Sequence, residues 1–202
     1  MKIKCELIIE RDGKEVYRGE SKSFLKNFGI VLAGMLKNTG AGDARKFVVV
    51  TNTAGASANV YVEDSFGGDV RYFGVMGFYA GDNDDSYGIL VGSGSTPVSP
   101  SDYALASKIP HGTGSGQLDY DTHNVLSGYG DTSGYVEIYR SFVNKSGGDV
   151  VVREVGLVAR SIDGAVPSDV RYLIARDLLP SPITVKPLGS LTVKYRISLA
   201  IR

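Results

Sequence analysis

The stretch GILVGSGSTPVSPSDYALASKIPHGTGSG (residues 88–116) contains the residue types of a phosphate-binding loop. Glycines and serines follow a short apolar segment, which is the order that nucleotide-binding loops use. A dinucleotide fingerprint, however, needs a third glycine where Pro97 stands and a helix beneath it, which Pro97 and Pro100 exclude. A P-loop ends in Gly-Lys-Ser/Thr, a tripeptide that does not occur in the sequence. We therefore interpret the stretch as structural: a strand, a glycine turn, an extended crossing and one helical turn that Ser99 or Ser101 could cap.

The two histidines could take part in a zinc site. His111 and His123 would need a third ligand, and Asp119 or Asp121 lies near them in the sequence. Zinc ligands usually have tighter spacing and lie on rigid elements. The sequence therefore favours no zinc site here.

An acidic segment, GDNDDSYG (residues 81–88), resembles the beginning of a calcium-binding loop through Asp82, Asp84 and Ser86. Tyr87 stands where the turn glycine belongs, and Ser93 stands where the bidentate glutamate belongs. An acidic hairpin turn is the better interpretation, and we expect no bound metal.

Candidates for nucleophilic or acid–base catalysis are equally weak. The sequence has no Gly-x-Ser-x-Gly elbow. Cys5 lies in an alternating segment and is interpreted as a small core residue. Asp84 and Asp85 are neighbours in a polar turn, without the apolar surroundings that acid–base catalysis uses. The sequence predicts a protein that is not an enzyme and uses no cofactor.

Composition limits the possible partners. Lys plus Arg number 22 and Asp plus Glu number 22, so no basic field indicates nucleic acid. The longest apolar stretch, FGIVLAGML (residues 28–36), is far shorter than the ~20 residues of a membrane span. One cysteine excludes an internal disulfide, and the first residues lack the apolar core of a signal peptide. We expect a protein made in the cytoplasm, with no nucleic-acid or membrane partner.

Short runs of Val, Ile, Tyr and Phe between glycines indicate an all-β protein. Asp12-Gly13 predicts a type I′ hairpin near the N-terminus. One amphipathic helix is expected over residues 21–38, capped by Ser21 or Ser23 and ended within 38–40. Its expected apolar stripe is Phe24, Phe28, Leu32 and Leu36, widened by Leu25, Val31 and Met35.

Strands are expected over residues 46–53, 59–64, 71–80, 86–92, 134–146, 149–161, 170–179 and 190–202. The last of them alternates between apolar and polar residues over its whole length, which is typical of a half-buried antiparallel strand. We predict one domain, 1–202, with an antiparallel β-sandwich or jelly-roll-like fold and one N-terminal helix. Residues 1–45 would supply a hairpin and the helix, and residues 46–202 the sandwich, with long loops at 93–134.

Four segments in order resemble structural proteins of tailed phages and related viruses. They are SKSFLKNFGIVLAGML (21–36), GILVGSGSTPVSPSDYAL (88–105), VVREVGLVARS (151–161) and YLIARDLLPSPITVKPLGSLTVKYRISLAI (172–201). The resemblance covers most of the chain, and the segment 112–134 departs from it. It implies a virion component of the tail (tube, tip or fibre-associated), made and assembled in the host cytoplasm. It also implies partners among other virion proteins and copies of the chain itself.

Two other classes stay open. A capsid or capsid-decoration protein fits the same resemblance. A carbohydrate-binding module that recognises a host-surface glycan through exposed Tyr and Asp side chains is a further alternative. A polysaccharide hydrolase is disfavoured, because no paired-carboxylate pattern stands out.

The long loops suggest a homo-oligomer. Ordering residues 93–110 and 112–134 would cost about 1–2 kcal/mol per residue, and their apolar residues are spaced too irregularly for a sheet or helix face. Burial against another copy would offset that cost. We predict that Tyr103, Leu105 and Ile109 anchor one chain on its neighbour.

Overall fold

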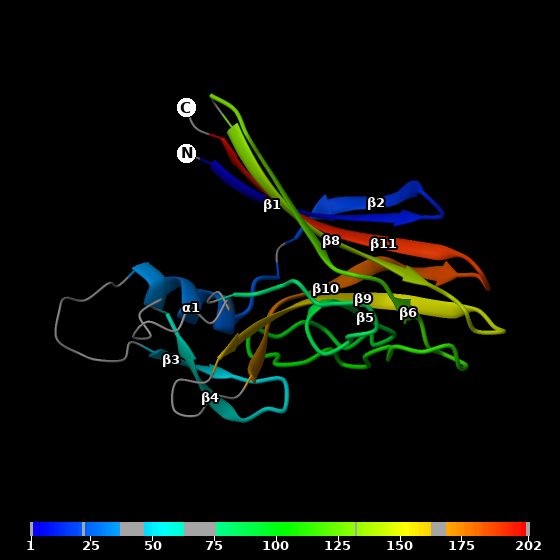
Figure 1. Cartoon of the computed structure of the whole chain (residues 1–202), viewed down its shortest axis with the longest axis horizontal. Coiled ribbons are helices and arrows are strands. Elements are labelled where there is room, and N and C mark those ends of the chain that lie inside the picture. Colours follow the sequence, from blue (N-terminus) through cyan, green and yellow to red (C-terminus); the bar gives the residue numbers. More distant parts are fainter. Residues whose placement is uncertain are drawn as a thin grey trace.

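The computed structural model describes residues 2–21, 23–36, 47–62, 76–131, 133–162 and 169–200. It is an all-β antiparallel sandwich with one short helix, as predicted (Figure 1). Its elements are β1 (Lys2–Arg11), β2 (Lys14–Glu20), α1 (Lys26–Leu36), β3 (Phe47–Thr51), β4 (Ser57–Tyr61), β5 (Gly88–Gly92), β6 (Asp119–Tyr120), β7 (Asn124–Tyr129), β8 (Ser133–Val143), β9 (Val150–Ile162), β10 (Asp169–Val185) and β11 (Ser190–Ala200).

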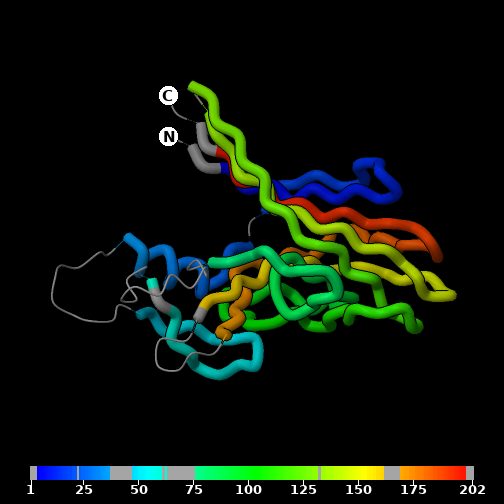
Figure 2. Tube along the Cα trace, viewed as in Figure 1, coloured from blue at the N-terminus to red at the C-terminus, as the bar shows by residue number. Residues whose placement is uncertain are grey.

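Two sheets form the sandwich. Sheet A has the order β2-β1-β11-β8-β6, and β7 pairs with β8 farther along the same edge. Sheet B has the order β10-β9-β5, while β3 and β4 form a separate ribbon. The trace in Figure 2 shows sheet A lying across sheet B, with the first and last described residues side by side at one end of sheet A.

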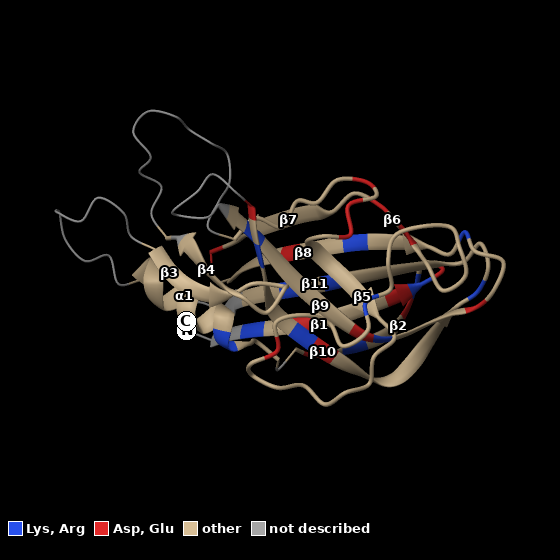
Figure 3. Cartoon of the chain, turned by 90° about the horizontal axis from the view of Figure 1, so that it is seen from below, with Lys and Arg blue, Asp and Glu red and all other residues tan. Residues whose placement is uncertain are grey.

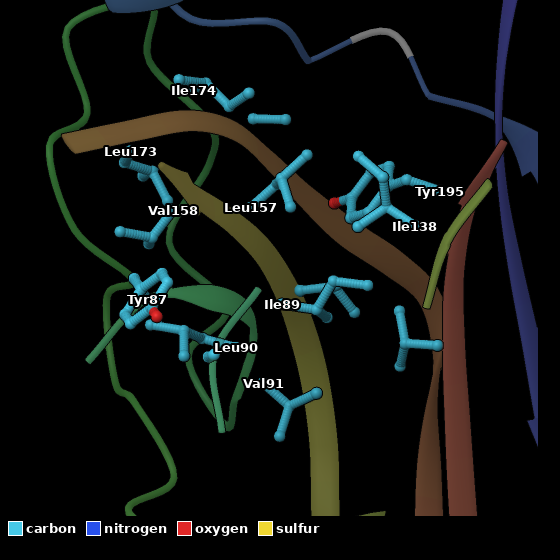
Figure 4. Close-up of a cluster of buried hydrophobic side chains, with 14 of the residues drawn as sticks. Tyr87, Ile89, Leu90, Val91, Ile138, Leu157, Val158, Leu173, Ile174 and Tyr195 are labelled. Atoms are coloured by element: carbon cyan, nitrogen blue, oxygen red, sulfur yellow. The ribbon is translucent and has the colours of Figure 1, made fainter. Parts of the chain in front are cut away.

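A single hydrophobic core joins the two sheets. Ile138 and Tyr195 enter it from sheet A, and Ile89, Leu157 and Leu173 enter it from sheet B (Figure 4). Each of these side chains is at most 2 % exposed, and burying one is worth about 1.5–3 kcal/mol. Residues of the N-terminal hairpin and of α1 belong to the same cluster, so one core serves both predicted parts of the chain.

The N-terminal hairpin forms as predicted. Asp12 and Gly13 have φ angles of 50° and 74°, the left-handed values that a type I′ turn requires. The alternation of β11 is confirmed from Leu191 to Tyr195: Leu191, Val193 and Tyr195 are buried, whereas the residues between them are partly exposed. Ile197, on the same face, is only partly buried.

Two strand predictions were wrong. Residues 71–75 lie outside the described residues, and 76–80 form no strand, only an isolated bridge between Gly77 and Arg160. Conversely, the segment 112–134 is not all loop, because β6 and β7 pair with β8 there. β10 also runs beyond its predicted end through Pro180 and Pro182, and its pairing with β9 shifts between Leu178 and Ile183.

The helix begins later than predicted, and its packed face includes only part of the predicted stripe: Val31 is buried and Phe28 packs against the core. Residues before Lys26 pair with β10 instead: Leu25 N–H donates to Ile174 O (2.8 Å). Ser21 does not cap the helix, because its hydroxyl donates to Asp177. The predicted helix end at 38–40 lies outside the described residues.

Val31 of the predicted stripe is buried together with Asn27, which the stripe did not include, whereas Leu32 and Leu36 of the stripe are 39 % and 76 % exposed. The Asn27 amide explains the choice of face, since it donates to Thr51 O and Leu173 O and accepts from Thr51 N–H. At 11 residues, α1 is the longest helix in the described part of the chain and falls short of what crossing a membrane requires.

Two glycines of α1 provide a matched test of this packing. A Cβ on Gly34 would lie 2.5 Å from Val48 Cγ1 and 3.0 Å from Val62 Cγ1, whereas a Cβ on Gly29 would meet nothing within 4 Å. We expect Gly29→Ala to stabilise the protein by about 0.5–1 kcal/mol through helix propensity. We expect Gly34→Ala to destabilise it by about 1–3 kcal/mol through overpacking, as measured by urea unfolding. Equal stabilisation by both substitutions would contradict this placement of α1.

Candidate functional site

Among the described residues, the most buried ion pair joins neighbouring strands of sheet B. Glu154 on β9 and Arg176 on β10 are 0 % and 1 % exposed. Arg176 Nε donates to Glu154 Oε2 at 2.8 Å. Burying two charges costs several kcal/mol per ion unless their other polar atoms also find partners.

The glycine-rich stretch supplies those partners. Glu154 Oε1 accepts from the backbone N–H of Gly94 (3.1 Å) and Ser107 (2.8 Å), and Oε2 accepts from Ala106 N–H (3.1 Å). A Cβ on Gly94 would lie 2.3 Å from Glu154 Oε1, so the backbone approaches this carboxylate as closely as only glycine permits. The loop with the composition of a phosphate-binding loop therefore binds an anion of its own chain.

Arg176 is equally well paired. Its Nη1 donates to Asp102 Oδ2 (2.6 Å) and its Nη2 to Thr96 O (2.9 Å). Burial alone would lower the pKa of Arg176, but the carboxylates of Glu154 and Asp102 raise it. The guanidinium thus stays charged and ties both ends of the crossing 96–102 to sheet B.

Sequence reasoning found the loop but missed its two central residues. A signal was present: Glu154 stands in phase with the buried Val150 and Val152 of the same strand. A charge at an inward position of an apolar alternation indicates a buried polar partner.

Two of the three predicted interface residues pack against other parts of their own chain. Ile109 is 4 % exposed and belongs to the core, and Leu105 packs on Gly156, where a Cβ would lie 2.8 Å from Leu105 Cδ2. Tyr103 is 45 % exposed and its ring lies against Gly55. Ile109 and Leu105 thus have separate sites on the sandwich of their own chain, and Tyr103 is the one of the three that is exposed for contact with a neighbour, which stays a prediction.

The two histidines have separate environments. His111 Nδ1 accepts from Tyr120 N–H (3.3 Å) and lies 3.5 Å from Asp119 Oδ1. His123 is fully buried, and neither ring nitrogen has a hydrogen-bond partner among the described residues. No group of three or more His, Cys, Asp or Glu side chains in the described ranges is placed to hold a metal ion.

Arg140 lies near His123 and stabilises an irregular part of the sheet edge. Its Nε donates to Asp121 O (2.7 Å), its Nη2 to Gly81 O (3.0 Å) and its Nη1 to Tyr87 O (3.3 Å). Burial, together with the positive charge of Arg140, lowers the pKa of His123 to about 3. His123 is therefore neutral throughout the physiological range.

The acidic segment 81–88 is a turn held by hydrogen bonds within the segment and to two other parts of the chain. Asp84 Oδ1 accepts from Ser86 N–H (2.9 Å) and from the Ser86 hydroxyl, and Asp85 Oδ2 accepts from His111 N–H (2.8 Å). Asp82 accepts from the Thr122 hydroxyl. Only the bonds of Asp84 lie within the turn, whereas Asp85 and Asp82 connect it to His111 and Thr122. The segment is a turn, as expected, but it is not a hairpin, because β5 pairs with β9 and residues 76–87 form no strand.

Cys5 is a core residue, as predicted. It is 7 % exposed, and burial with the nearby charge of Asp177 raises the pKa of its thiol to about 11. Asp177 accepts hydrogen bonds from Tyr195 Oη and Ser21 Oγ, both at 2.9 Å. The thiol is thus held in the unreactive protonated form.

The remaining candidate site is a surface. One half of sheet A extends past sheet B as an arm, which begins beyond the buried pair Ile138–Tyr195 and is made of residues 2–4, 124–129, 133–137 and 196–200 (Figure 1). On the arm's sandwich-facing side, Val125 and Tyr129 are 47 % and 83 % exposed, and Val136 and Ile197 are only partly buried. Exposed apolar groups gathered on one face indicate an interaction site.

Reciprocal tyrosine–glycine contacts stiffen the arm. The Tyr129 ring lies 3.2 Å from where a Gly134 Cβ would stand, and the Tyr135 ring would overlap a Cβ on Gly128. The Tyr135 ring also stacks under Arg196, whose Cζ lies 4.2 Å from the ring centroid. Aromatic rings that cover strand glycines keep a projecting hairpin ordered.

Comparison of the chain with protein-family models, with curated proteins and with solved structures found no match. Class and role therefore rest on the residues themselves.

Proposed function

We propose that the chain is a virion structural protein that self-assembles as a tail component. The alternative within the same class is a capsid or capsid-decoration protein, because the resemblance to virion proteins supports both locations. The protein would act through buried surface, with copies of itself and other virion proteins as its partners.

The network around Glu154 supports the resemblance on which this proposal rests. Three of the four resembling segments meet there: Gly94 and Asp102 come from 88–105, Glu154 from 151–161 and Arg176 from 172–201. These residues are far apart in the sequence but form one network. We expect this of motifs that are inherited together as parts of one fold.

The observation that carries self-assembly is the arm. Val125, Leu126 and Tyr129 lie on β7, the edge strand of the four-stranded arm, and are 47 %, 50 % and 83 % exposed. An ordered projection with apolar side chains is suited to burial against another subunit.

Labelling of virus particles tests the proposed role. An antibody raised against the folded chain should bind intact particles released by cells that make the protein, as seen by electron microscopy with gold-labelled antibody. If the cells contain the protein but the particles that they release are not labelled, the proposed role as a virion protein is wrong.

A glycan-binding role is the second candidate, favoured by Tyr79. Its ring is 65 % exposed and lies close in sequence to the exposed acidic residue Asp82. Tyrosine rings beside carboxylates suit the apolar faces and hydroxyls of sugars. Saturable binding on a glycan array that Tyr79→Ala abolishes would favour this candidate over a purely structural subunit.

A further inference from the structure

The edges of the two sheets differ in whether another part of the chain covers them. Both edges of sheet B are covered by the chain itself: Ile109 N–H donates to Val91 O (2.9 Å) at the β5 edge, and Leu25 N–H donates to Ile174 O (2.8 Å) at the β10 edge. Sheet A has β2 at one edge and β7 at the arm end of the other. An uncovered edge can pair with another chain unless charge, proline or a bulge prevents it.

The two edge strands of sheet A differ in charge. β2 carries Lys14, Glu15, Arg18 and Glu20 within its seven residues. The sequence of β7, NVLSGY, has no charged residue and no proline (Figure 3). β2 is therefore protected against pairing with other strands, whereas β7 is not.

The free hydrogen-bonding groups of β7 can be assigned. Gly130 N–H donates to Ser133 O (2.8 Å), which makes 130 and 133 a hydrogen-bonded pair. Because such pairs alternate along an antiparallel ladder, Gly128 and Leu126 also face β8, while Val125, Ser127 and Tyr129 direct their N–H and C=O groups away from it. Among the described strands, β7 pairs with β8 alone.

We propose that β7 pairs antiparallel with β7 of a second copy, about a twofold axis at Ser127, so that sheet A continues across the dimer. This inference rests on the proposed self-assembly and names its surface. Ser127 would lie opposite itself, and Val125 would lie opposite Tyr129 of the second copy. Each of these opposed pairs exchanges two backbone hydrogen bonds.

The side chains favour a second copy as the occupant. Val125 and Tyr129 stand two residues either side of Ser127 and share one face of the sheet. The twofold axis therefore places each exposed Tyr129 ring beside Val125 of the other copy, an aromatic–β-branched pair of the kind that stabilises antiparallel strands. On the opposite face, Leu126 meets Gly128 of the other copy, where it lies against the Tyr135 ring that covers this glycine. β7 is thus complementary to itself in hydrogen bonds and in shape.

Charge substitutions at Ser127 test the register. The Ser127 side chain is exposed, so Ser127→Lys and Ser127→Glu should leave the monomer folded. In the proposed dimer each would place like charges opposite each other. We expect each variant of the full chain alone to show a lower mass by light scattering than the wild type, and an equimolar mixture of the two to recover the wild-type mass.

Two controls accompany these variants. Ser127→Ala adds no charge at the axis and should keep the wild-type mass. Val16→Lys adds a charge at an exposed position of the other edge strand and should keep it too. Loss of the assembly in Val16→Lys would show that β2, and not β7, is the pairing edge. Failure of the mixture to recover the wild-type mass would contradict the register that places Ser127 opposite itself.

The outcomes separate this inference from the proposed function. If Ser127→Lys stays assembled, self-assembly holds and β7 is not its surface. If the wild-type chain is a monomer at every concentration, both the dimer and the self-assembling role fail, and the uncharged edge would then be a site for the strand of a different protein.

Discussion

Replacing Glu154 with alanine is expected to destabilise the protein by about 3–5 kcal/mol. The substitution removes the carboxylate that pairs with Arg176 and leaves three backbone N–H groups of the covering loop, those of Gly94, Ala106 and Ser107, without their acceptor. For a chain of this length the melting temperature should fall on the order of 10 °C. Urea unfolding followed by circular dichroism measures the loss, and hydrogen exchange should show faster exchange over residues 93–107.

An exposed ion pair provides the matched control. Lys186 and Asp149 lie 2.6 Å apart, with side chains 71 % and 45 % exposed. Asp149→Ala should change the stability by less than about 1 kcal/mol, because water replaces the lost partner. If Glu154→Ala and Asp149→Ala cost the same, the loop is not held by the buried carboxylate.

The second large effect is a loss of folding stability at low pH, which we expect His123 to cause. The pKa of His123 is about 3 in the folded chain and near 6.5 when unfolded. As the pH falls below 6.5, the unfolded chain takes up a proton that the folded chain excludes, so stability is lost progressively down to the folded pKa. The linkage amounts to ~1.4 kcal/mol per pH unit, or roughly 3 kcal/mol between pH 7.5 and pH 4.

His123→Leu should remove this contribution without leaving any hydrogen bond unmade, since neither ring nitrogen has a partner among the described residues. The difference in unfolding free energy between the wild type and His123→Leu is measured at several pH values. His111→Gln, at the other histidine, should retain the wild-type loss. Parallel pH profiles for the wild type and His123→Leu would show that His123 is not the buried neutral group that we describe.

Features encoded by local pattern were predictable from the sequence. The Asp12-Gly13 turn, the alternation of β11 and the apolar runs of β5 and β9 each depend on neighbouring residues, and all formed as expected. The face of α1 was predictable only in part, because Val31 and Phe28 pack as expected whereas the burial of Asn27 was not expected. Asn27 is buried because backbone groups of β3 and β10 need its amide, which is information held by residues distant in the sequence.

The loop over residues 93–110 shows the same limit. Its irregular apolar spacing was interpreted as surface for a neighbour, whereas Ile109 and Leu105 each occupy a separate site on the chain's own sandwich. Glu154 and Arg176 organise the loop from strands 47 or more residues away, so local periodicity could not reveal the contact. The arm was missed for a related reason: β7 is short and rich in small residues, and only its pairing with β8 identifies it as a strand.

The mass of the unmodified full-length chain in solution tests the central claim most directly. Sedimentation equilibrium should give an average mass that is a multiple of the mass of one chain at protein concentrations well above the dissociation constant of the assembly. On dilution to concentrations near that constant, the average mass should fall. The account predicts an assembly built on the twofold pairing of β7. A mass of one chain at every concentration, up to the limit of solubility, would contradict it.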